Sequence, residues 1–278
     1  MKLHKIFVYQ LIMLAFLAVT GCQEEERVGL QDAPDTAKVA IVNVATPTRP
    51  VPATSSQIMG YLFFMDNRQL YSQSLVTNKT TGYFLVDPGA RTLKIDSAAA
   101  IINVAQPRGT VNTTNLTADA GKYYSVFIAG RVQAPEVVVT TDDLTRPEAG
   151  KAKVRVIHLS PDSPSLDVAG TVAASPAAVP VLFGGNTYKK ATDFTNIASG
   201  FYRLQVREAG ATTALSTATN TNQTAPCFFC TGSATAEFTM NLEAGKIYTL
   251  VIRGYRSPTT AGQIANPLSV GGLMNLNF

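Results

Sequence analysis

The chain has 278 residues, of which 46% are hydrophobic and 15% are charged. Apolar content at this level supplies a buried core, and a chain of this length forms one large or two ordinary domains, so extensive disorder is excluded. The formal net charge of +4 comes from scattered basic residues with no run denser than Lys189-Lys190, which excludes a nucleic-acid-binding surface as well.

The first 21 residues have the pattern of an export signal. Two lysines precede an apolar run over residues 6–19, and Val19-Thr20-Gly21 then leads into Cys22. The run is about 14 residues long, whereas a transmembrane helix needs about 20. Its ending resembles the bacterial lipobox, which implies that residues 1–21 are removed and that Cys22 is acylated as the first residue of the mature chain. An ordinary signal peptide and a transmembrane anchor are the alternatives.

Residues 22–37 are expected to form a polar tether between this lipid and the folded part. The tether begins with the acidic run Gln23–Glu26, and charge runs are normally solvated. Acidic residues directly after such a cysteine resemble the export signal of cell-surface lipoproteins in some Gram-negative bacteria. This resemblance implies attachment to the outer membrane through the lipid, and display on the cell surface.

After the tether, the chain has the pattern of an all-β protein. Turn residues recur about every 8–12 positions, and Val, Ile, Thr, Tyr and Phe dominate the runs between them. Tyr202, Leu204 and Val206 alternate with polar residues, which is typical of a half-buried antiparallel strand. Sustained helical periodicity is lacking, so we expect little helix.

Three segments of the chain occur twice, in the same order. The matched pairs are 37–42 with 152–157, 89–95 with 200–206, and 120–130 with 244–254. Such ordered matches predict a duplicated β-sandwich, as domain 1 over 38–141 and domain 2 over 152–278, joined by a linker at 142–151. We expect the core to receive Tyr124, Val126 and Ile128 in one copy and Tyr248, Leu250 and Ile252 in the other. Asp142-Asp143 is expected to be solvated in the linker.

The segment Lys153–Pro164 is similar to the opening motif of the bacterial family called domain of unknown function 4397. Residues 200–206 and 244–250 also resemble that family, and the likeness is stronger over 152–254 than over 37–141. The resemblance implies immunoglobulin-like antiparallel sandwiches in tandem, in exported or lipid-anchored proteins. It implies no reaction.

His158, Asp162 and Asp167 are the one grouping of histidine with carboxylates in the mature chain. A metal site needs three or four converging ligands, and this pattern does not supply them. Asp162 lies in a Ser-Pro-Asp-Ser-Pro turn and is expected to bond its own backbone. We therefore interpret all three residues as structural and expect no catalytic residue, no metal and no cofactor.

Cys227 and Cys230 flank two phenylalanines in a polar insertion. In an oxidising compartment the two thiols are expected to form a disulfide. A thioredoxin-like role would place them in a βαβ pattern, which the sequence lacks. The bridge could direct Phe228 and Phe229 outward as an apolar tip that contacts a partner, or the two rings could cover the sandwich as a lid.

These features predict a non-catalytic binding or structural module, held in the envelope by lipid, that recognises a glycan or a protein through its loops. One alternative is an accessory docking subunit of an uptake or secretion system. A second is an envelope hydrolase that uses His158, or a thiol-redox protein that uses the Cys227–Cys230 pair.

Overall fold

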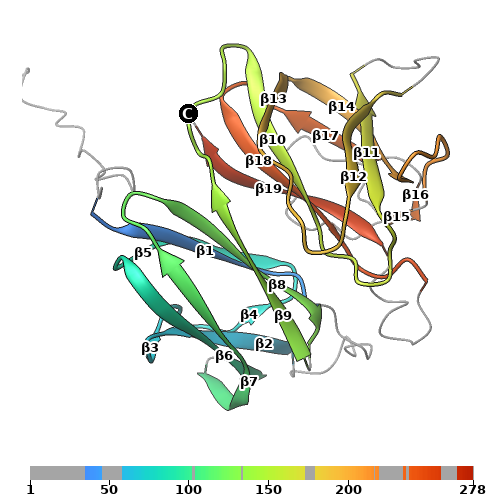
Figure 1. Ribbon diagram of the computed structural model, residues 1–278. Helices are drawn as coiled ribbons and strands as arrows, with labels where there is room; N and C mark the ends of the chain where they lie inside the picture. The colour runs from blue at the N-terminus through green and yellow to red at the C-terminus, as the bar shows by residue number, and fades with distance from the viewer. Residues whose placement is uncertain are drawn as a thin grey trace, which may run out of the picture. The chain divides into compact units, whose positions relative to one another are not determined.

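The computed structural model describes residues 35–45, 58–101, 104–132, 134–172, 179–215, 217–218, 234–235, 238–257 and 268–277. Within this part of the chain every regular element is a β-strand, so the all-β class is confirmed (Figure 1). The same residues contain no helical segment with the length and apolar character that a membrane crossing requires. Residues 35–278 form one compact unit, so the domain boundaries given above stay predictions.

Strands β1 to β9 form two sheets that face each other, here called the first sandwich. One sheet has the order β5-β1-β8-β9, with β1 at Ala37–Asn43, β5 at Lys79–Val86, β8 at Tyr123–Arg131 and β9 at Ala134–Asp142. The other has the order β3-β2-β6-β7, with β2 at Ile58–Met65, β3 at Arg68–Gln69, β6 at Gly89–Ile101 and β7 at Val104–Ala118, and β4 at Leu75–Val76 pairs with β2.

Strands β10 to β19 form the second sandwich with an equivalent strand order. Its first sheet runs β13-β10-β18-β19-β15-β16, with β10 at Lys151–His158, β13 at Thr195–Ala198, β15 at Thr217–Ala218, β16 at Ala234–Thr235, β18 at Lys246–Arg253 and β19 at Ser269–Asn277. Its second sheet runs β12-β11-β14-β17, with β11 at Leu166–Thr171, β12 at Val181–Asn186, β14 at Gly200–Glu208 and β17 at Phe238–Leu242.

Both sandwiches contain a parallel ladder at the equivalent place, which differs from the antiparallel expectation, and the second sandwich also pairs β15 in parallel with β19. Strand β1 pairs in parallel with β8, and β10 pairs in parallel with β18. Parallel neighbours need a long crossover, and here the other strands of each sandwich provide it. The two ladders are equivalent, because Lys38 lies opposite Tyr123 and Lys153 lies opposite Ile247, as the sequence matches require.

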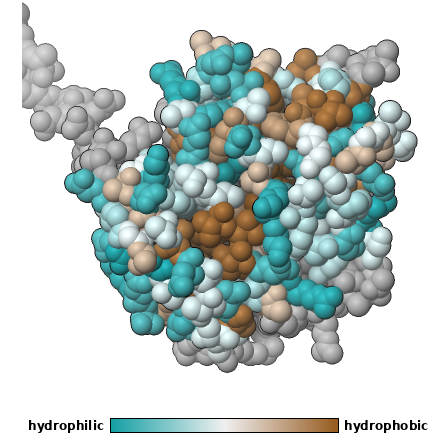
Figure 2. Space-filling view, in the orientation of Figure 1, coloured by the Kyte–Doolittle hydropathy of each residue, from teal (hydrophilic) through white to brown (hydrophobic). Residues whose placement is uncertain are grey.

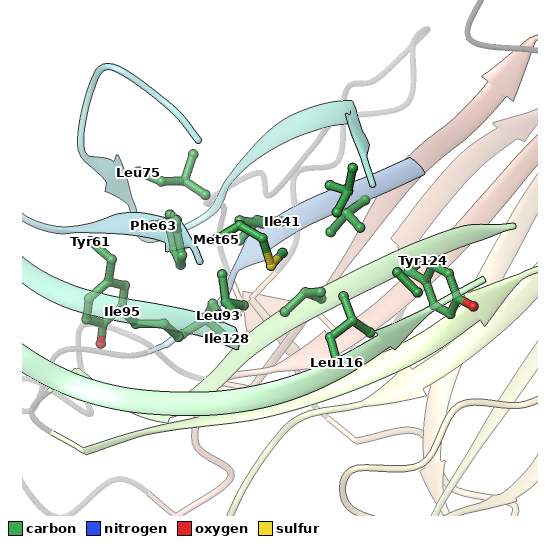
Figure 3. Close-up of a cluster of buried hydrophobic side chains, with 14 of the residues drawn as sticks. Ile41, Tyr61, Phe63, Met65, Leu75, Leu93, Ile95, Leu116, Tyr124 and Ile128 are labelled. Carbon is green, nitrogen blue, oxygen red and sulfur yellow. The ribbon is translucent and has the colours of Figure 1, made fainter. Parts of the chain in front are cut away.

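The predicted inward-facing residues form the two cores. Tyr124, Val126 and Ile128 lie in the core of the first sandwich, where Figure 3 shows aromatic and aliphatic side chains of both sheets converging. In the second sandwich the core contains Tyr248, Leu250 and Ile252 together with the alternating residues of β14. In both copies the core tyrosine hydroxyl accepts a backbone N–H five residues earlier, from Asp119 at 3.0 Å and from Glu243 at 3.1 Å.

The sheets that contain β1 and β10 also pack against each other through their outer faces. A third apolar cluster joins them and consists of Val42, Val44, Phe127, Ala129, Ile157, Leu159 and Val251. Because both faces of these sheets are covered, every residue of β1 is buried rather than every second one. The strands that open each copy are therefore central to the compact unit.

Asp142 corrects one expectation from the sequence. It does not lie in a solvated linker but ends β9, with a fully buried side chain that forms an ion pair with Arg155 at 2.6 Å. The carboxylate also accepts hydrogen bonds from the hydroxyls of Tyr83 and Ser125, both at 2.6 Å. The neighbouring Asp143 is exposed, as expected. The packing of the second sandwich over the end of β9 accounts for the burial of Asp142.

Candidate functional site

The predicted lipid and disulfide residues, Cys22, Cys227 and Cys230, lie outside the described residues. The same holds for Phe228 and Phe229. Acylation, the disulfide and the apolar tip therefore stay predictions. Among the residues that the structure does describe, no cluster of three or more His, Cys, Asp or Glu side chains is placed to hold a metal ion.

His158 is buried at the end of β10, and both of its ring nitrogens have partners. The backbone N–H of Ser160 donates to Nδ1 at 3.2 Å, and Nε2 lies 3.0 Å from the carbonyl oxygen of Pro164. Because Nδ1 accepts, Nε2 carries the hydrogen and the ring is neutral. Burial lowers the pKa of His158 below its ordinary value, against the opposing effects of the Pro164 carbonyl and the Asp162 charge. This geometry gives the imidazole a structural role in the turn.

Asp162 organises a different segment from the one expected. Its Oδ1 accepts the backbone N–H of Arg256 and its Oδ2 that of Ser257, each at 2.8 Å. Strands β10 and β18 are parallel neighbours, so the segments that follow them leave the sheet at the same edge. The carboxylate therefore bonds the backbone after β18, and the contact within its own turn is with a side chain, the hydroxyl of Ser160 at 3.3 Å.

Asp167 likewise binds backbone. Its Oδ1 accepts the N–H of Gly185 at 2.7 Å, and its Oδ2 accepts the N–H of Gly210 at 2.9 Å. Both glycines have positive φ, at 66° and 79°, a conformation that other residues adopt with difficulty. Asp167 thus joins two turns, and it does not converge with His158 on a common site.

A cleft of about 490 Å³ lies where the β8–β9 hairpin meets the segments that follow β10 and β18. It is lined by Gly130, Arg131, Ala134, Glu136, Pro161, Asp162, Tyr255 and Ser257. Equivalent strand ends of the two copies thus meet here, because β8 ends at Arg131 and β18 ends two residues before Tyr255.

The cleft carboxylates are held in place by neighbouring groups. Glu136 accepts a hydrogen bond from the hydroxyl of Tyr188 at 3.1 Å and forms an ion pair with Lys189. Burial raises the pKa of Tyr188 strongly, and the charge of Glu136 adds to this effect, so the phenol remains a donor. The ring of Tyr188 stands edge-on to His158, with centroids 6.2 Å apart. The His158 turn therefore supports one wall of the cleft.

Sequence reasoning did not identify Arg131, Glu136 or Tyr255. Arg131 and Glu136 lie in the β8–β9 hairpin and Tyr255 follows β18, and none of the three belongs to a motif that points to a site. The one available signal is the match of 120–130 with 244–254, which places Gly130 and Gly254 at equivalent positions. Both have positive φ, at 72° and 84°, and residues that directly follow them, Arg131 and Tyr255, line the cleft.

A second cleft, of about 390 Å³, lies in the first sandwich. Its lining combines apolar side chains such as Met65, Phe84 and Leu85 with the charged residues Asp66, Arg68, Asp87 and Arg91, of which Asp66 and Arg91 form an ion pair at 2.9 Å. Large exposed apolar side chains among the described residues are Leu85, Val139, Val172, Val181 and Phe201. Figure 2 shows hydrophobic patches of limited extent within a largely hydrophilic face.

The fold and its polar contacts define an all-β protein of stacked sandwiches. Residues 53–169 match the model of the family described as domain of unknown function (DUF4397), which confirms the resemblance predicted from the sequence. The matched range ends in β11 and so lies mainly in the first sandwich, whereas the motifs pointed more strongly to residues 152–254. The search of curated proteins gives no match.

Three solved structures illustrate what the fold is similar to. A streptococcal virulence factor that binds alpha-glucan has 9% identity, covers 61% of this chain and 79% of its own, and has a TM-score of 0.22. A carbohydrate-binding module of Eubacterium rectale, solved with maltoheptaose, has 7% identity and a TM-score of 0.22, and the match covers 80% of this chain and 95% of the module. A putative cell adhesion protein of Bacteroides fragilis has 9% identity and a TM-score of 0.20, and the match covers 88% of this chain and 99% of that protein. At these TM-scores the similarities support no inference of function.

Proposed function

We propose that this chain is a non-catalytic binding protein of the bacterial envelope, anchored in the outer membrane by lipid on Cys22 and displayed on the cell surface. The observation that carries the binding role is an open polar cleft beside polar side chains whose own role is structural. His158, Asp162 and Asp167 hold backbone segments in place, and the cleft lies beside the turn that contains His158 and Asp162.

The joined sandwiches support this role. Arg155 and Asp142 pair inside the contact between the two sheets, and the ring of Phe127, a member of the apolar cluster, lies 6.0 Å from the guanidinium of Arg155. A unit cross-connected in this way keeps the loops that line the cleft at fixed separations, which reduces the entropy that binding would otherwise cost. A tether over residues 22–37 would then carry a rigid recognition unit away from the membrane.

The contacts of His158 argue against the alternative of a hydrolase that uses this residue as its general base. A general base needs a free nitrogen within reach of a substrate, and both nitrogens of His158 already hold protein groups. The position of the Cys227–Cys230 pair lies outside the described residues, so thiol labelling with and without reductant remains the test of that alternative.

Lipid labelling tests the anchor. Cells that express the full chain are grown with radiolabelled palmitate, and the protein is recovered and partitioned between detergent and water. The wild type is expected to incorporate label and enter the detergent phase, whereas Cys22→Ala is expected to do neither. Protease shaving of intact cells then tests surface display, and an unlabelled wild-type protein would overturn the proposal.

A further inference from the structure

Strand β9 is an edge strand of the first sandwich, and its outer side is open. Among the described strands it pairs with β8 only. No residue over 136–141 is buried, and Val139 is 37% exposed, whereas seven consecutive residues of the neighbouring β8 are buried. The backbone donors and acceptors of such an edge form a template to which another strand can add.

The equivalent strand of the second sandwich, β19, has a covered edge. The two strands correspond, because β9 follows and pairs antiparallel with β8 and β19 does the same with the matched strand β18. On the outer side of β19 lies β15, with Ala218 opposite Ser269, and Ser269 is 2% exposed. An insertion between β14 and β17 supplies β15 and β16, whereas the equivalent strands β6 and β7 are consecutive. The fold therefore covers this edge in one copy and leaves it open in the other.

The available backbone groups of β9 belong to two valines. Successive residues of a strand direct their N–H and C=O groups to opposite sides. The carbonyl of Pro135 accepts a hydrogen bond from a side chain of β7 at 2.9 Å, and that of Thr141 accepts one from a side chain of β10 at 3.3 Å. Both donors lie outside the β8 ladder, so the odd-numbered residues over 135–141 point away from β8. The outward groups of Val137 and Val139, between these contacts, have no partner in the described part of the chain.

The same strand lacks the features that keep edge strands apart. Its register with β8 is regular over its whole length, and no charged residue lies between Glu136 and Asp142. By contrast, β5 at the opposite edge of the sheet has an irregular register and begins with Lys79. Bulges and lysines on edge strands oppose the addition of a further strand. The uncharged valine-rich run of β9 offers no such opposition.

We propose that β9 pairs antiparallel with β9 of a second copy of this chain, across a twofold axis that passes beside Val138. The axis places Val137 of each copy opposite Val139 of the other. Each of these two pairs exchanges an N–H to C=O hydrogen bond in both directions. The pairing thus uses the outward groups of both valines in both copies, and it needs none from the occupied ends of the strand.

Charge and symmetry favour a second copy as the partner. Glu136 falls opposite Thr140 of the second copy, so like charges do not meet across the axis. A twofold contact is closed, so it joins two sheets of the first sandwich into one and removes the open edge from both copies. The pairing does not depend on lipid at Cys22, and its failure would leave the proposed anchor untouched.

Sedimentation equilibrium of the full chain in density-matched detergent tests the dimer. The wild type should associate as its concentration rises into the micromolar range. Val139 lies diagonally across the axis from its counterpart, so Val139→Lys brings like charges within reach and should lower the association constant at least about tenfold. An equimolar mixture of Val139→Lys and Val139→Glu should associate again. The matched control is Leu85→Lys, at a residue that is 51% exposed on the opposite edge, and it should associate like the wild type.

Disulfide trapping in membranes of expressing cells tests the register. Facing residues of a non-hydrogen-bonded pair have Cα atoms about 4.5 Å apart, within the range that a disulfide spans, so Val138→Cys should form a reducible dimer on mild oxidation. The wild type and Thr80→Cys, at a half-buried position on β5, control for the native cysteines and should not form it. A monomeric wild type, a mixture of charged variants that fails to associate, or equal trapping of Thr80→Cys would overturn the proposal.

Discussion

The carboxylate of Asp142 lies 2.6 Å from the guanidinium of Arg155, and the two side chains are 0% and 2% exposed. Thr249 accepts a further hydrogen bond from Nε of Arg155 at 2.9 Å, and the ring of Phe194 lies 4.4 Å from the guanidinium. This ion pair connects the last strand of the first sandwich to the first strand of the second. A buried pair of this kind adds directional contacts to an interface that also contains an apolar cluster and further hydrogen bonds, such as that from Asn275 to the hydroxyl of Tyr83 at 3.2 Å.

Arg155→Met is expected to destabilise the chain by about 3–5 kcal/mol, because it leaves the Asp142 charge buried without a cation. Urea denaturation followed by tyrosine fluorescence measures the loss. The double variant with Asp142→Asn should recover most of it, since no unpaired charge then remains. Lys151→Met is the control, because its partner Glu148 is 60% exposed and surface pairs contribute about 0–1 kcal/mol. A cost for Arg155→Met as small as that of the control would contradict the buried pair.

The contact between the sandwiches predicts cooperative unfolding. Ile157 is fully buried in the cluster that joins the two sheets. The wild type should therefore unfold in one calorimetric transition, and Ile157→Asp, which places an unpaired charge in that contact, should split it into two. Thr195→Asp, at an exposed position on β13, is the control and should leave one transition. Two transitions already present in the wild type would show that the sandwiches unfold independently.

The strands and their inward faces could be predicted because the signal for them is local. Alternation along β14 and the apolar repeats of β8 and β18 identify the cores without knowledge of the partners. The contact between sandwiches could not be found in this way, because Lys38 and Arg155 occupy positions that look solvent-facing and yet are 1% exposed. Their burial depends on a second sheet that no local pattern encodes.

The cleft could not be predicted from the sequence either, because it too depends on contacts between the two sandwiches. Its residues come from three segments that are distant along the chain, and what brings them together is the packing of one copy on the other. Duplication offered a clue, since the ends of β8 and β18 are equivalent. Only the structure shows that these ends face a common space, beside the turn that Asp162 fixes.

Gly170→Ala is expected to destabilise the second sandwich by about 1–3 kcal/mol through overpacking. A Cβ at Gly170 would lie 2.4 Å from a methyl of Leu204 and 2.8 Å from a methyl of Leu182, closer than side chains can approach. Gly184→Ala on the neighbouring strand β12 is the matched control, because its Cβ would meet no atom nearer than 3.5 Å. The urea denaturation midpoint of Gly170→Ala should be lower than that of Gly184→Ala. Equal midpoints would show that Gly170 has room for a methyl group.

His158 predicts a loss of stability in mild acid. The unfolded chain binds a proton at this residue near pH 6.5, whereas burial lowers the pKa of the folded imidazole. The unfolded state thus holds more protons below about pH 6.5, so the free energy of unfolding should be constant above that pH and fall as the pH drops towards the folded pKa.

His158→Gln checks this assignment, because it keeps a donor near the Pro164 carbonyl but does not titrate. Urea denaturation at intervals between about pH 7 and 5 should give a sloping stability for the wild type and a flat one for the variant, since most carboxylates titrate lower. The chain that begins at Cys22 suits the measurement, because the other histidine, His4, lies in the predicted leader. A slope that persists in His158→Gln would assign the proton to another group and contradict the neutral, buried ring.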